Sequence, residues 1–140
     1  MTPPGRERRA ADRGAVAVEM ALSVPMVVLM FFLIIGAFQI ARAQISVASA
    51  AGAGARAASM ARSAVAATAA ARASVETNLH GRCAALAVTV ATEGFARGGA
   101  VTVSVTCTVN VRGLTGVAVP AELDLKATAT SPVDVYREAT

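Results

Sequence analysis

The sequence is poor in the side chains from which enzyme sites are usually built. It has no tryptophan, one tyrosine, four phenylalanines, two cysteines and a single histidine, His80. Nothing in the segment around that histidine, residues 78–83, suggests a catalytic partner for it, so we expect an exposed loop residue. Two cysteines and one histidine also fall short of a metal-ligand set. Without an acid–base, nucleophile or metal constellation, the sequence predicts no enzyme activity, no cofactor and no metal.

Basic charge is concentrated at the N-terminus, within a formal net charge of +4. Four of the thirteen basic residues lie in the first fourteen positions: Arg6, Arg8, Arg9 and Arg13. No stacking aromatic side chains accompany them, so the pattern does not predict binding to nucleic acid. Residues 1–14 are polar and contain Pro3-Pro4-Gly5, which predicts a disordered basic leader.

An uncharged run of 22 residues, from Met20 to Ala41, follows this leader. At about 1.5 Å per residue, a helix of this length spans the roughly 30 Å hydrocarbon layer of a membrane. The positive-inside rule places the arginine-rich N-terminus in the cytoplasm and residues 43–140 outside. We therefore expect a single-pass cell-membrane protein with a cytoplasmic leader at residues 1–14 and a transmembrane helix at residues 15–41.

The rest of the chain predicts an α+β fold. Residues 42–78 are rich in alanine and lack proline, so we expect the membrane helix to continue outside the membrane, with a break near Gly52 and Gly54. Residues 79–140 are predicted to form a small extracytoplasmic β domain. Apolar residues alternate with polar ones from Val101 to Val111, and shorter alternations occupy residues 86–90 and 122–129. These patterns predict a three-stranded antiparallel meander with one face packed on the long helix.

Cys83 and Cys107 both lie outside the membrane in this topology. Thiols in that oxidising environment are expected to form one disulfide, with free buried thiols as the alternative. The bond would tie the start of the β domain to the middle of its longest strand. In the chain-entropy model, a loop of this size adds about 3 kcal/mol of stability.

The most specific motif is RGAVAVEMALSVP at residues 13–25, where the apolar run begins. A carboxylate at mid-membrane costs about 2.5–3.5 kcal/mol on insertion scales, and less near the interface. Glu19 is therefore either a boundary residue at headgroup level or a residue with a specific role.

Pro25 removes one backbone hydrogen bond inside the span and predicts a kink there, with or without a role in packing.

This motif resembles the TadE-like family of pilus-assembly pseudopilins when it is taken with Gly36, Arg42 and the AAGAGAR segment at residues 50–56. The resemblance covers residues 13–56. It implies a structural or assembly component of a tight-adherence (Flp-type) pilus or secretion system. The implied partners are other pilins and pseudopilins, the pilus-assembly platform and a prepilin peptidase.

The resemblance also implies roles for particular residues. The peptidase would cut between Gly14 and Ala15, which makes Glu19 the fifth mature residue. Glu19 would then pair with the N-terminal amine of a neighbouring subunit as the helices bundle away from water. Met20 departs from the family pattern, because Tyr or Phe follows the glutamate in the major Flp pilins and in many pseudopilins.

The sequence leaves one other function open, a secreted binding module with a cleaved signal peptide. Ala41-Arg42-Ala43 is a small-x-small cleavage site, with the cut after Ala43. The apolar run is, however, longer than the 7–15 residues typical of a signal-peptide core. The mature N-terminus distinguishes the alternatives: Ala15 for a processed pseudopilin, Gln44 for a secreted module, and Met1 or Thr2 for an uncut anchor.

Overall fold

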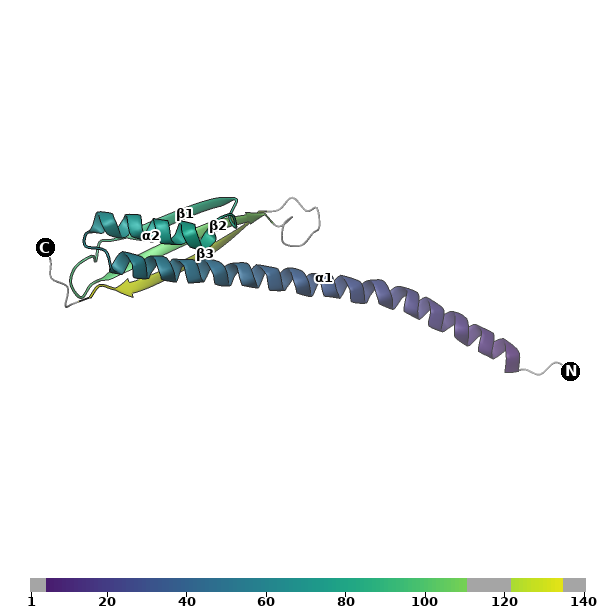
Figure 1. Ribbon diagram of the computed structural model, residues 1–140. Helices are drawn as coiled ribbons and strands as arrows, with labels where there is room; N and C mark the ends of the chain where they lie inside the picture. The colour runs from purple at the N-terminus through teal and green to yellow at the C-terminus, as the bar shows by residue number, and fades with distance from the viewer. Residues whose placement is uncertain (1–4, 111–121, 135–140) are drawn as a thin grey trace. The chain divides into compact units, whose positions relative to one another are not determined.

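A computed structural model describes residues 5–110 and 122–134, with side chains described from residue 17 onward. Two helices precede three strands (Figure 1): α1 Gly5–Ser59, α2 Ala64–Leu79, β1 Ala85–Ala91, β2 Ala100–Asn110 and β3 Glu122–Pro132. The predicted α+β class is confirmed. The chain divides into two compact units, one up to Phe38 and one from Gln39 onward.

Helix α1 begins at Gly5, so the prediction of a disordered leader is wrong for residues 5–14. Those residues are mostly Arg, Glu and Ala, which are good helix formers, and the Pro3-Pro4 pair lies before them. The helix continues through Pro25. From Val18 to Phe38, its large apolar side chains are between 47% and 74% exposed.

The three strands form one antiparallel sheet in the order β1-β2-β3, as the alternating patterns predicted. Val105 in β2 is paired with Val88 in β1 and with Ala127 in β3. Every second residue of β2, from Val101 to Val109, is buried, and the residues between them are only partly covered. The sheet therefore has one apolar face and one wetted face. Val111, the predicted end of the long strand, lies outside the described residues.

The core lies between the apolar face of the sheet and both helices, not the long helix alone. Helix α1 contributes Val47, Ala50, Ala51, Ala55 and Ala58 to one buried cluster. Helix α2 contributes Ala67, Ala71, Val75 and Leu79 to the same cluster. No polar or charged side chain is buried among the described residues. Small alanines on both helices allow the helix backbones to approach the sheet closely.

The break in the long helix lies farther along the chain than predicted. Helix α1 ends at Ser59 and α2 begins at Ala64, whereas the sequence predicted a break near Gly52 and Gly54. Gly54 is instead buried at the contact with α2. Ser63 caps the start of α2: its hydroxyl accepts a hydrogen bond from the Ala66 amide at 3.2 Å. Such an N-cap satisfies one of the free amides at the start of a helix.

Candidate functional site

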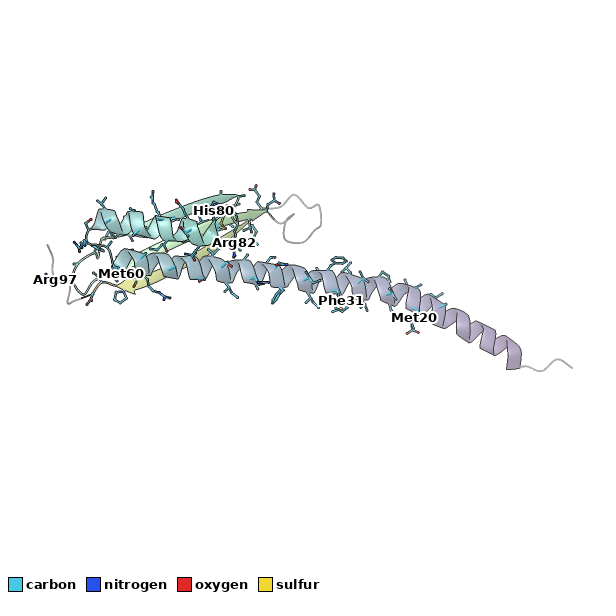
Figure 2. The ribbon with its side chains drawn as sticks, viewed as in Figure 1. Met20, Phe31, Met60, His80, Arg82 and Arg97 are labelled. Atoms are coloured by element: carbon cyan, nitrogen blue, oxygen red, sulfur yellow. A yellow bond between two sulfur atoms is a disulfide. The ribbon has the colours of Figure 1, made fainter. Side chains whose placement is uncertain are left out.

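The first compact unit contains a stretch of α1 whose apolar side chains are exposed. From Ala17 to Ser59, α1 is long and apolar enough to cross a membrane, with a mean hydropathy of 2.6 in its most apolar stretch. Figure 2 shows the side chains near Met20 and Phe31 projecting from the helix. Ten consecutive apolar residues, 26–35, are exposed, so this stretch has no polar face. A helix that is apolar on every side is typical of a membrane span.

The C-terminal part of α1 has a different environment. From Val47 onward, one side of the helix is buried against the sheet. Gln44 Nε2 donates a hydrogen bond to the carbonyl of Lys126 in β3 at 2.9 Å, and Ser131 Oγ donates one to Ser59 Oγ at 3.1 Å. The part of α1 from Gln44 to Ser59 is therefore hydrogen-bonded to β3 and belongs to the folded domain. Sequence reasoning missed these contacts, because the partners are 82 and 72 residues apart.

The predicted processing and pairing residues lie near the N-terminal end of the apolar stretch. Gly14 and Ala15 both lie inside α1, and Glu19 is exposed one turn farther on. Residues four apart in a helix share a face, so Ala15 and Glu19 lie on the same side of α1. The side chains of the leader arginines and of Ala15 fall outside the described residues.

Cys83 and Cys107 form a disulfide, with their Cα atoms 5.4 Å apart. Cys83 lies in the turn before β1, and Cys107 is 1% exposed in β2. Next to the bond, the Ala84 amide donates to the carbonyl of Thr108 at 2.7 Å. The bond therefore holds the turn after α2 against the centre of the sheet.

His80, the one histidine, lines a hollow on α2 together with Glu76 and Thr77. His80 is exposed at the end of α2. Arg56 is exposed on α1, Arg72 on α2, and Arg62 in the connection between the two helices. Within residues 17–110 and 122–134, no group of three or more His, Cys, Asp or Glu side chains could hold a metal ion.

Residues 14–56 match the model of one protein family, described as TadE-like protein. Over this segment the chain is similar to the TadE-like family. The resemblance drawn from the sequence is confirmed, and the family is generally non-enzymatic. The TadE-like segment contains Glu19, the apolar stretch and most of the part of α1 that packs on the sheet, but not α2 or the strands. Neither the curated proteins nor the solved structures gave a match to the chain.

Proposed function

We propose that this TadE-like protein is a single-pass, membrane-anchored pseudopilin that acts as a structural or assembly component of a tight-adherence pilus or secretion system. The observation that supports this most strongly is that the TadE-like segment, residues 14–56, contains a stretch of helix that is exposed and apolar on every side. Such a surface requires lipid or neighbouring apolar helices around it. Both surroundings are available to a pseudopilin, in the membrane before assembly and in a helical bundle after it.

The proposed topology has four parts: a cytoplasmic leader at residues 1–14, a transmembrane helix at 15–41, an extracytoplasmic helix at 42–78 and a β domain at 79–140. The span ends before Arg42, because α1 carries a charge there and packs on the sheet soon afterwards. The disulfide fits a domain in an oxidising compartment.

Cleavage between Gly14 and Ala15 would change the surroundings of Glu19. The new N-terminal amine on Ala15 would lie one turn from the carboxylate, on the same face of α1. The carboxylate would also lie near the positive end of the new helix dipole. In a bundle of subunits, Glu19 then pairs with its own amine or with that of a neighbour, and the charge is neutralised away from water.

The junction itself lies inside a helix, so a peptidase has to unwind that part of α1 before it can cut. Gly14 favours this step, because glycine destabilises a helix interior by about 1 kcal/mol relative to alanine. Gly14 therefore provides both the residue before the cut and a weak point in the helix.

The test is co-purification of a Glu19→Gln variant with pilus-assembly partners from membranes. We expect insertion to be unchanged, because the substitution only makes the helix more apolar. Recovery of partners should fall, because the amine that Glu19 neutralises is left unmatched in a low-dielectric site.

Glu76→Gln is the matched control, since it makes the same chemical change on the exposed face of α2. It should recover partners as the wild type does. Equal recovery with Glu19→Gln at matched membrane levels would mean that Glu19 is a solvated boundary residue. A chain that ends up in the soluble fraction would contradict the membrane anchor itself.

A further inference from the structure

A cavity of about 380 Å³ opens at the base of the folded domain, where α1, β2 and the turn after α2 meet. Its volume is at the lower end of the range for ligand pockets. The buried side chains of Val47, Leu79 and Cys107 form its apolar floor. Its polar lining comes from Gln39, Arg42, Ser46 and Arg82. The described residues that line it include two arginines and no carboxylate.

Arg82 is held at this cavity by local structure. Gly81 adopts a φ of +69°, a conformation that side-chain-bearing residues avoid, and this directs the chain back after α2. The Arg82 amide then donates to the carbonyl of Leu79 at 3.0 Å. The next residue, Cys83, is fixed to β2 by the disulfide. In Figure 2, Arg82 lies at this turn.

A short chain of hydrogen bonds connects the two arginine positions. Arg82 Nη1 donates to Ser46 Oγ at 3.0 Å, and Ser46 Oγ donates to the carbonyl of Arg42 at 3.0 Å. A guanidinium carries five N–H donors, so the bond to Ser46 leaves most of the Arg82 fork available to a ligand. The fork matches phosphate oxygens in a bidentate geometry.

The depth of the cavity along α1 indicates where a phosphate would come from. Arg42 directly follows the uncharged run, and Ser46 lies about 7.5 Å beyond Ala41 at about 1.5 Å per residue. Each headgroup layer is about 5–7.5 Å thick, which is half the difference between a whole bilayer of about 40–45 Å and its hydrocarbon core of roughly 30 Å. Both side chains therefore fall at headgroup depth if the proposed membrane anchor is correct.

From this geometry we propose that the Arg42–Arg82 cavity binds the phosphate of an anionic phospholipid headgroup in the extracytoplasmic leaflet. The inference rests on the proposed membrane anchor. Arg42 and Arg82 contact the phosphate, and Gln39 and Ser46 provide neutral hydrogen-bonding groups. One bound lipid would then fix the height of the folded domain above the membrane before assembly.

The test uses the full-length chain, extracted from membranes and placed in nanodiscs of phosphatidylcholine with a minority of phosphatidylglycerol. Native mass spectrometry counts the phosphatidylglycerol that the protein keeps on release. Arg82→Gln should lower this retention about tenfold, the effect of losing one good charge-assisted contact. Arg72→Gln, which removes the same charge from the exposed face of α2, should leave it unchanged.

Two further measurements keep the outcomes distinct. Ser46→Ala retains both charges but releases Arg82, so it should weaken retention by a smaller factor. An unchanged thermal unfolding curve in detergent shows that each variant is folded. Inorganic phosphate is titrated into the lipid-free wild type in detergent. Phosphate binding without retained phosphatidylglycerol would contradict the lipid as ligand.

Equal lipid retention by Arg82→Gln and Arg72→Gln in membrane-inserted protein would overturn the cavity assignment alone. Wild-type protein in the soluble fraction would contradict the anchor, and the lipid site with it. Because residues 20–41 are the same in all the variants, membrane recovery reports on the anchor independently of lipid retention.

Discussion

A β-carbon on Gly54 would lie 2.8 Å from Cγ2 of Val75 and 3.3 Å from the carbonyl oxygen of Ala71. The backbone of α1 at Gly54 therefore lies in close contact with α2, and no space is left there for a side chain. Val75 is fully buried and β-branched, so it cannot turn aside easily. Gly52, two residues earlier in the same helix, has no atom within 4 Å of the corresponding position.

These two glycines make a matched pair for measuring stability. Gly54→Ala gains about 1 kcal/mol of helix propensity, but overpacking typically costs about 1–3 kcal/mol, so we expect a net loss of stability. Gly52→Ala should instead gain about 0.5–1 kcal/mol. Thermal unfolding of the full chain in detergent, measured side by side, checks both signs. Stabilisation by both substitutions would contradict the close contact between Gly54 and Val75.

The disulfide should stabilise the folded domain measurably. Replacing both Cys83 and Cys107 by alanine opens a loop that is worth about 3 kcal/mol in the chain-entropy model. For a domain of this size, that loss lowers the melting temperature by about 12 °C or more. A reducing agent should also lower the melting temperature of the wild type. It should not change the melting temperature of the double variant, which has no disulfide to reduce. An unchanged melting temperature in both experiments would mean that the bond contributes little.

The orientation in the membrane should depend on the leader arginines. Replacing all four by glutamine removes the positive charge before the span, so the fraction of chains with an exported domain should fall. Formation of the disulfide in vivo reports on export. Replacing Arg56, Arg62 and Arg72 by glutamine removes positive charge beyond the span and should leave export unchanged or improved. Reduced export in this control, with an unaffected leader variant, would reverse the proposed topology.

The elements that the sequence predicted correctly are those marked by a local pattern of apolar residues, either an alternation or an uninterrupted run. The alternation around Val103 and Val105 identified β2, and the uncharged run after Glu19 identified the exposed part of α1. The position of the helix break was missed, because glycine was taken as a breaker in an Ala-rich helix. Ser63, followed by a run of alanines, was the local signal that could have found it, since serine is a preferred N-cap.

The cavity could not have been predicted in the same way. Arg42 and Arg82 are 40 residues apart, and no short motif connects them. They line one cavity only because α2 packs antiparallel to α1 and ends beside Ser46, to which Arg82 donates. Residue patterns record which face of an element is buried, whereas the meeting of two distant polar residues is decided by packing between elements.

The mature N-terminus decides between the functions that the sequence left open. We expect the purified protein to begin at Ala15, since the TadE-like resemblance implies a cut after Gly14 and glycine weakens the helix there. Gly14→Leu should block the cut, because it places a bulky side chain at the junction and strengthens the helix around it. Membrane insertion should continue, since residues 20–41 are unchanged. Intact-mass measurement of both proteins from membranes reads the result directly.

Gly36→Leu is the matched control, because it makes the same change inside the apolar stretch, away from the junction. It should be processed as the wild type is. A wild-type mass that begins at Gln44 would identify a secreted module, and one that begins at Met1 or Thr2 an uncut anchor. In the uncut case no amine forms on Ala15, so the pairing proposed for Glu19 would lose its partner, while the anchor and the cavity at Arg82 would be unaffected.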